Sequence, residues 1–315
     1  MVSGMCAGAV AAPAADAVYP ARPIRLISPF TPGGGNDLVS RAVALAVSRN
    51  IGQSIVVDNR PGANTIVGME LLAKAAPDGY TLITTSSTQA INATLYPKLP
   101  YDSIRSFAPV TLVGSSPLIV AVPPASSIRS VADLIAAARA KPGDLTFPSA
   151  GTGNATHLGG ELFAAMAGIT LTHVPYKGSG PGLTDLAAGR LAVAFSTALS
   201  VMPFVKAGRL RALAVTGAAR SSFVPELPTV AESGLPGYEA STWYGVLAPA
   251  GTPRIIVAQL NAEIVKVLAL SEVRERLIPQ GIDPLGNTPE QFATYLGSEI
   301  VKWAKVIKAT GVTAE

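Results

Sequence analysis

The chain has 315 residues, of which 49% are hydrophobic and 14% charged, with a formal net charge of +4. This composition supplies a large buried core and excludes an intrinsically disordered chain, and the length favours two lobes over one. No charge-free apolar run reaches the ~20 residues that a membrane-spanning helix needs. Lys and Arg are scattered instead of forming a basic arm interleaved with aromatic residues, so we expect no nucleic-acid partner.

The N-terminal residues carry an export signature. Residues 5–12 are small and apolar, and Ala15-Asp16-Ala17 fits the small-x-small pattern before a cleavage site. We therefore interpret residues 1–17 as a signal segment. The positively charged start of such a segment is missing, because the first basic residue is Arg22, so the segment is either a truncated signal or an Ala-rich tail. Cys6 is the single cysteine and lies inside this segment, so a mature chain would have no disulfide or thiolate metal site.

Strands and helices alternate through the first part of the chain, where alternating apolar runs predict strands and helical spacing predicts helices. A passage of strand character follows, with two apolar runs around residues 115–117. Strand–helix alternation at this rhythm is typical of a parallel, right-handed wound sheet. The predicted strands are 23–30, 54–58, 80–84 and 107–123, and the predicted helices are 38–46 and 66–75.

The same alternation restarts after residue 123, and two glycine-containing strand–turn–helix units echo each other at 24–46 and 145–167. Residues 227–253 read as loop-rich, and the end of the chain as helical. The predicted strands are 145–149, 172–176, 191–195 and 210–216, and the predicted helices are 131–140, 157–167, 183–188, 201–207, 257–268 and 289–307.

This order of elements predicts a two-lobed α/β protein in which each lobe is a mainly parallel sheet flanked by helices. We expect the first lobe to comprise residues 18–122 plus 221–315 and the second 123–220. A hinge would then lie near residues 122 and 220.

Two glycine turns follow the first strand of each half, Gly33-Gly34-Gly35 and Gly151-Thr152-Gly153. Ligands of open parallel sheets sit beyond the carboxyl ends of strands, where turns and helix starts expose backbone N–H groups. Two such turns facing one another, with the Ser149 and Thr152 hydroxyls, would hold a carboxylate without an Arg clamp. The alternative interpretation is ordinary turn chemistry. Asp37 would repel an anion, so we expect it to point back into its own loop, as an N-terminal carboxylate commonly does.

Signatures of catalysis are missing from the sequence. A dinucleotide fingerprint fails because its third glycine would fall on Leu38 or Thr156, and neither turn continues as Gly-Lys-Ser or Gly-Lys-Thr. No G-x-S-x-G motif occurs. We therefore expect no catalytic residue, no cofactor and no metal site.

Further side chains are candidates for the cleft or for packing. His157 starts a helix beside the second turn and could equally line the cleft or support it, whereas His173 fits a hydrogen-bonded core imidazole. Tyr176 and Lys177 end a strand facing the same cleft. Trp243 is a cleft candidate because its segment reads as a loop, and Trp303 fits packing.

Motifs spread over residues 19–311 strongly resemble the Bug-type (tripartite tricarboxylate transporter) solute-binding proteins. They include Pro29-Phe30 through Asp37, Asn59-Arg60-Pro61-Gly62-Ala63, Ala75-Ala76-Pro77-Asp78-Gly79-Tyr80, His173-Val174-Pro175-Tyr176-Lys177-Gly178, Leu227-Pro228-Thr229-Val230-Ala231-Glu232 and Leu247-Ala248-Pro249-Ala250-Gly251-Thr252-Pro253.

The resemblance implies a type II-like periplasmic binding protein, located in the periplasm. Such a receptor closes on a small carboxylate and hands it to the permease subunits of a tripartite transporter, which some relatives lack. We expect a monomer. The candidate ligand-binding residues, from the turns and from this resemblance, are Phe30, Thr31, Gly33, Gly34, Gly35, Asp37, Ser86, Ser87, Thr88, Ser149, Ala150, Gly151, Thr152, Gly153, His157, Tyr176 and Ser196.

One position departs from the family pattern. Relatives often have Phe-Asp where this chain reads Phe195-Ser196-Thr197. The loss of that acidic group favours a non-amino carboxylate over aspartate or glutamate. Two alternatives stay open at this point: a periplasmic sensory receptor for a membrane kinase, and an α/β enzyme that acts on a small carboxylate.

Overall fold

The computed structural model describes residues 19–176 and 178–314, so the predicted signal segment with Cys6, and Lys177, lie outside the described residues. The strands are β1 (Ile24–Ser28), β2 (Ile55–Asn59), β3 (Thr81–Ser86), β4 (Phe107–Val122), β5 (Thr146–Ser149), β6 (Thr172–Pro175), β7 (Ala194–Thr197), β8 (Arg211–Val215), β9 (Ser241–Pro249) and β10 (Asp283–Pro284). The helices are α1 (Gly35–Ile51), α2 (Ile66–Ala73), α3 (Ser87–Leu95), α4 (Val131–Ala140), α5 (Ala155–Ala167), α6 (Ser179–Ala187), α7 (Ala198–Lys206), α8 (Arg254–Leu268), α9 (Ser271–Leu277), the short 3₁₀ helix η1 (Ile278–Gln280) and α10 (Pro289–Thr310).

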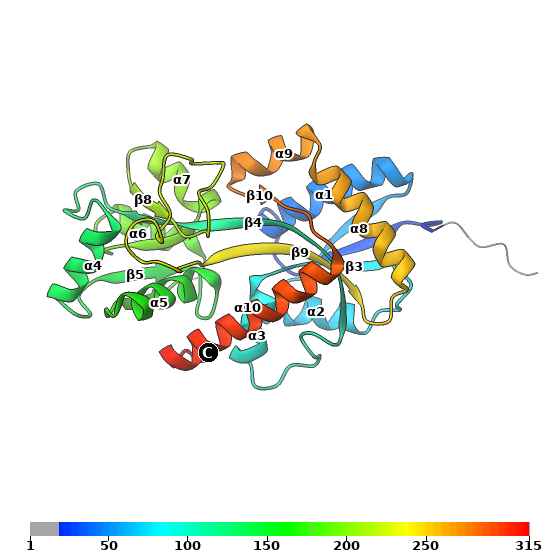
Figure 1. The fold of residues 1–315 in the computed structure, drawn as a ribbon, viewed down its shortest axis with the longest axis horizontal. Coiled ribbons are helices and arrows are strands. Elements are labelled where there is room, and N and C mark those ends of the chain that lie inside the picture. Colours follow the sequence, from blue (N-terminus) through cyan, green and yellow to red (C-terminus); the bar gives the residue numbers. More distant parts are fainter. Residues whose placement is uncertain (1–18, 177, 315) are drawn as a thin grey trace, which may run out of the picture.

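The first lobe is a sheet with helices on both faces, in the order β10-β4-β9-β3-β1-β2. β1 pairs in parallel with β2 and β3, and β9 lies antiparallel to both β3 and β4. Successive side chains of a strand point to opposite faces. Leu26 therefore packs with α1 and α8, while its neighbour Ile27 packs with α2, α3 and α10. Figure 1 shows α1 and α8 on one side of the sheet and α2, α3 and α10 on the other.

Strand β4 joins the two lobes. Its first part, up to Pro117, pairs with β9, and its last part, from Leu118, pairs with β7 and β8. β5 and β6 form a separate parallel pair in the second lobe. In Figure 1, β4 and β9 run along the long axis of the molecule, from the half with α1 and α8 toward the half with α5 and α7. The two-lobed α/β fold is confirmed, whereas the exact lobe bounds and the hinge positions stay predictions, because β4 serves both halves. The sheets are mixed and not mainly parallel as we expected, because the long strand β4 pairs antiparallel with β7, β8, β9 and β10.

Two expectations about elements were wrong. Residues 227–253 are not simply loop, since β9 lies inside them and is a central strand of the sheet. Trp243 therefore does not face the cleft; it sits on β9 with 0% exposure. The sequence Ser-Thr-Trp-Tyr-Gly-Val-Leu is short and flanked by Gly and Pro, which hid the strand. Helix α3 was missed because Ser86, Ser87 and Thr88 favour caps and turns over helix interiors.

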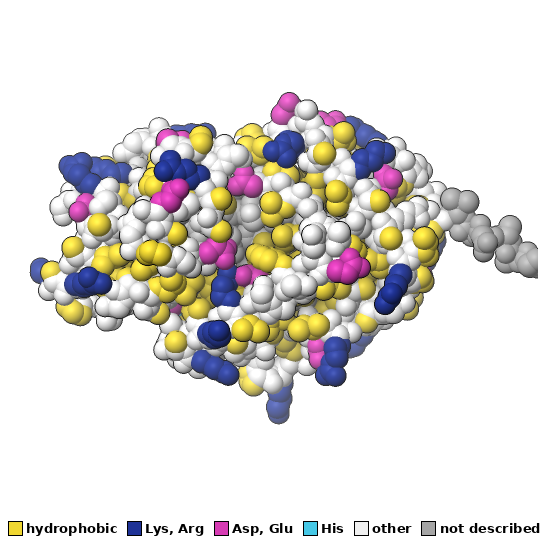
Figure 2. All heavy atoms as spheres, in the orientation of Figure 1, with side chains coloured by type: hydrophobic (Ala, Val, Ile, Leu, Met, Phe, Trp, Pro, Cys, Tyr) yellow, Lys and Arg dark blue, Asp and Glu magenta, His cyan; other side chains and the backbone are white. Residues whose placement is uncertain are grey.

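Charged side chains on the visible face occur in small separate groups of both signs (Figure 2). Within residues 19–176 and 178–314, no helix combines the length and apolar character that crossing a bilayer requires.

Candidate ligand-binding cleft

The first glycine turn connects β1 to α1, and the Asp37 side chain, at the start of α1, stabilises it by hydrogen bonds. The Asp37 carboxylate accepts hydrogen bonds from the Gly33 N–H at 3.0 Å, from Arg41 Nε at 2.9 Å and from Asn59 Nδ2 at 2.9 Å. Burial raises the pKa of Asp37, but these donors outweigh burial and hold the pKa below its ordinary value. Asp37 thus points back into its loop and fixes the turn.

Gly35 permits a close approach between this turn and β9. A Cβ built on Gly35 would collide with the Tyr244 hydroxyl, whereas one on Gly34 would meet nothing closer than the Thr31 carbonyl oxygen at 3.8 Å. Tyr244 is buried, and burial raises the pKa of its phenol. The phenol therefore presents a neutral O–H beside the start of α1.

The second turn connects β5 to α5, and its amides are already used within the turn. The Ala150 N–H donates to Thr156 Oγ1 at 2.9 Å, the Gly151 N–H to Ser149 Oγ at 3.2 Å and the Gly153 N–H to His157 Nδ1 at 3.0 Å. We expected these turn amides to grip the ligand themselves. The structure instead assigns them to holding the shape of the turn.

A cavity of about 230 Å³ lies between the two lobes, at the N-terminal ends of helices from both. Three helices that contribute residues to its wall, α1, α6 and α7, have no side chain capping their first turn. Its lining residues are Phe30, Thr31, Gly34, Gly35, Asn36, Ser86, Thr88, Ala150, Asn154, Ala155, Thr156, Ser179, Thr197, Thr242 and Tyr244.

The wall of this cavity combines apolar surface with polar groups, and it carries no formal charge in the described part of the chain. Its polar groups are hydroxyls, amides and the starts of α1, α3, α5, α6 and α7. The first N–H groups of a helix have no partner within the helix and bear the positive end of its dipole. Five helix starts from two lobes therefore converge on one cavity. Ser86 and Asn154 cap those of α3 and α5, whereas α1, α6 and α7 have no side-chain cap and leave first-turn N–H groups that suit an anion.

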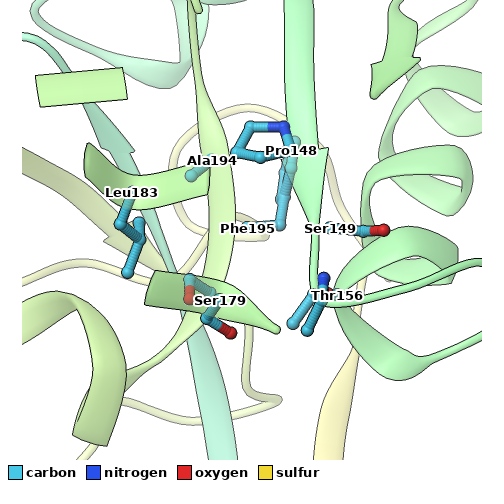
Figure 3. A pocket seen from close by; sticks show the side chains of 9 residues that line it. Pro148, Ser149, Thr156, Ser179, Leu183, Ala194 and Phe195 are labelled. Carbon is cyan, nitrogen blue, oxygen red and sulfur yellow. The ribbon is translucent and has the colours of Figure 1, made fainter. Parts of the chain in front are cut away.

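A second, much smaller pocket of about 10 Å³ adjoins this cavity and shares Ala150, Thr156 and Ser179 with it. Figure 3 shows Ser149 and Thr156 on one side of this pocket and Leu183 and Ala194 on the other, with Ser179 and Phe195 between them. Ser196 lines this pocket, is 4% exposed, and its Oγ has no hydrogen-bond partner among the described residues.

The predicted site residues divide into two groups. Those that line the cavity are Phe30, Thr31, Gly34, Gly35, Ser86, Thr88 and Ala150. Those that lie outside its lining are Gly33, Asp37, Ser87, Ser149, Gly151, Thr152, Gly153, His157, Tyr176 and Ser196. Within the second group, Ser87 Oγ lies 3.1 Å from Oγ1 of Thr242, which lines the cavity, whereas Tyr176 donates at 2.7 Å to Asp185 Oδ2, which does not.

Sequence reasoning missed eight lining residues. Ser179 and Thr197 could have been found, because each stands where a strand or its turn gives way to a helix, as the two glycine turns do. Thr242 and Tyr244 were hidden with β9. The others are Asn36, Asn154, Ala155 and Thr156. Within the described ranges, no group of three or more His, Cys, Asp or Glu side chains is placed to hold a metal ion.

The fold and the cleft together define a two-lobed solute-binding protein. The profile of the "Tripartite tricarboxylate transporter family receptor" matches residues 39–312, and the chain belongs to this family. The Bordetella pertussis protein BugT is 39% identical over 96% of this chain and 93% of its own length. The resemblance to Bug-type proteins is thereby confirmed.

Solved structures support the same assignment. R. palustris Rpa4515 with adipate superposes with a TM-score of 0.82 at 38% identity, covering 94% of this chain and 99% of that one. MatC from Rhodopseudomonas palustris with bound malate has a TM-score of 0.77 at 30% identity, covering 92% and 100%. Both ligands are small dicarboxylates.

Proposed function

We propose that this protein is a periplasmic receptor that captures a small carboxylate in the cavity between its lobes and delivers it to the permease subunits of a tripartite transporter. One observation carries the proposal: helix starts from both lobes converge on a single cavity whose described wall has no charged side chain. The family of the chain and the adipate and malate seen in its structural neighbours support the carboxylate class and the role in uptake.

The anion would be held by N–H groups and hydroxyls instead of by a cation. A hydrogen bond to a charged group contributes about 1.5–3 kcal/mol, so three or four such bonds would support micromolar affinity, about −8 kcal/mol. Because the donors belong to both lobes, a bound carboxylate would tie the lobes together. Binding free energy would thereby favour the closed arrangement.

We further propose that the ligand carries no amino group. An ammonium buried in this site would need an acidic partner to balance its charge. The described wall has no Asp or Glu, and position 196, beside the cavity, is a serine.

A thermal-shift screen with adipate, malate and glutamate tests this function. A true ligand should stabilise the protein by about 2.7 kcal/mol at a hundredfold excess over its dissociation constant. We expect stabilisation by at least one plain dicarboxylate and none by glutamate. No shift with any carboxylate would refute the proposed function, and a shift with glutamate alone would refute the proposed specificity.

A further inference from the structure

The chain contains two histidines, and they stack on each other directly behind the second turn. The centroid of the His157 ring, on α5, lies 3.6 Å from the centroid of the His173 ring, on β6, and the two ring planes make an angle of 15°. His157 is 4% exposed, and the Phe147 ring packs against both imidazoles. The stack, with His157 buried and His173 half-buried, thus lies at the junction of the turn with its supporting strands.

Each imidazole holds one end of the second turn. His157 Nδ1 accepts the Gly153 N–H at 3.0 Å, and His173 Nε2 lies 2.7 Å from Ser149 Oγ. Ser149 Oγ also lies 3.0 Å from the Gly151 carbonyl oxygen, and when it donates its proton there, His173 Nε2 is the donor toward Ser149. Protonation would leave that bond intact, since a charged imidazole still donates.

His157 is the sensitive member of the pair. An acceptor nitrogen carries no proton, so the Gly153 bond requires a His157 ring that is neutral and protonated only on Nε2. Protonation at Nδ1 would turn the acceptor into a donor facing the Gly153 N–H. Charging both rings would also place two cations in a 3.6 Å stack. Protonation of His157, or of both histidines, would therefore destabilise the observed conformation of the turn.

The position of Gly153 matters to the cavity. It adopts φ +75°, and a Cβ on it would collide with Leu95 of α3 in the first lobe, so the turn packs closely across the cleft. Ala150 and Asn154, which flank the turn, both line the cavity. Releasing Gly153 from His157 would therefore disturb the second-lobe wall of the site.

We propose that His157 is a positioning residue for the ligand turn, and that carboxylate affinity falls in mild acid because the neutral His157 Nδ1 is needed to hold Gly153. This inference rests on the proposed carboxylate-binding function. The charged group that faces the pair among the described residues is Glu161 on α5, whose Oε1 lies 3.5 Å from His157 Nε2. β5 presents Phe147 and Ser149 to the pair, neither of which is charged.

The sign of the effect separates this role from a direct one. If the imidazoles served the ligand as a nearby cation, protonation would strengthen binding of an anion. If His157 works through Gly153, protonation weakens it. Above about pH 6 both carboxyl groups of an ordinary dicarboxylate are largely ionised, so the ligand itself contributes little to a trend between about pH 6 and 8.

The experiment is calorimetric titration of the tag-free protein with adipate across that range, for wild type, His157→Asn and His157→Leu. Asn offers an uncharged acceptor near the place of Nδ1, and Leu offers none. Where His157 is protonated, it must release one proton before the turn can form, so wild-type affinity should fall by up to about tenfold for each pH unit toward acid. His157→Asn should keep the neutral-pH affinity within about threefold and lose the slope. His157→Leu should bind weakly at every pH.

A wild-type affinity that is constant or rises in acid would overturn the inference, as would a slope that survives in His157→Asn. Imidazole ¹⁵N spectra of the wild type give a readout that needs no ligand, and two histidines make it simple to assign. We expect His157 in the Nε2–H form at neutral pH, with Nδ1 accepting the Gly153 N–H. A proton on Nδ1 at neutral pH would also overturn the inference. Failure of every carboxylate to bind at neutral pH would instead refute the proposed function.

Discussion

Trp243 and Trp303 donate their indole N–H groups to the same oxygen, Glu299 Oε2, at 2.9 and 3.0 Å. Trp243 belongs to β9 and Trp303 to α10, so one carboxylate links a strand of the central sheet to the C-terminal helix. The other oxygen, Oε1, pairs with Lys302 Nζ at 2.5 Å. Glu299 is 3% exposed, and its charge is balanced where it is buried.

Replacing Glu299 with Ala should destabilise the fold strongly. The change leaves two buried indole N–H groups without an acceptor and Lys302 without one of its two carboxylates, which costs about 2–5 kcal/mol. Urea unfolding followed by circular dichroism measures it. The matched control is Glu272→Ala, which breaks an exposed pair with Arg49 and should cost less than about 1 kcal/mol. Equal losses of unfolding free energy in the two variants would mean that Glu299 does not stabilise the contact between β9 and α10 as proposed.

Gly35→Ala should impair binding far more than Gly34→Ala. The first places a methyl group against the Tyr244 hydroxyl, and the second meets ordinary space at a φ of −82°. We expect at least about a tenfold loss of carboxylate affinity for Gly35→Ala and less than about a twofold change for Gly34→Ala, as a displaced donor loses a charge-assisted bond. Calorimetry at neutral pH measures both. Similar affinities in the two variants would contradict the close approach at Gly35.

Thr197→Asp and Thr197→Asn form a pair that isolates charge. Thr197 lines the cavity and precedes α7 without a side-chain cap, and both substitutes are good caps for a helix start. The two variants should therefore unfold at similar temperatures. Only Asp adds a negative charge to the wall, and its repulsion of a bound carboxylate should lower affinity by about tenfold or more relative to Asn. Equal binding by the two would argue against an anionic ligand in this cavity.

Asp37 should make the ligand-free protein sensitive to acid. Its pKa is held below the ordinary value by Arg41, Gly33 and Asn59 despite burial, so its stabilising contribution is present above the unfolded pKa of about 4 and is lost as pH falls toward the folded value. Between about pH 5 and 3, Asp37→Asn should lose less stability than the wild type. Urea unfolding midpoints of the wild type and of Asp37→Asn at these two pH values measure the difference. An equal loss of stability in both proteins would show that other carboxylates dominate acid unfolding.

The parts of the fold that followed from the sequence are those with strong local signals. The strand–turn–helix units around Gly33 and Gly151 combine an apolar run, glycines and helical spacing, and both occur nearly where predicted. β9 lacked such a signal, because its pairing partners β3 and β4 lie far away in sequence. Strand character there depends on tertiary pairing more than on local propensity.

For the site, the sequence indicated the place but not the donors. Both turns lie beside the cavity, yet the amides of Ala150, Gly151 and Gly153 are occupied by Thr156, Ser149 and His157. A sequence does not reveal which hydrogen bonds a turn makes to its own side chains. The strand-to-helix junctions at Ser179 and Thr197 are visible in the sequence, but that both reach the same cavity depends on the tertiary arrangement of the two lobes.

The most direct test of anion capture by neutral donors is calorimetry with adipate and with its uncharged diamide, which matches adipate in length and shape. Micromolar binding of adipate, about −8 kcal/mol, with no measurable binding of the diamide is the predicted result. Equal affinity for the two molecules, or binding of the diamide alone, would contradict a cleft built for a carboxylate.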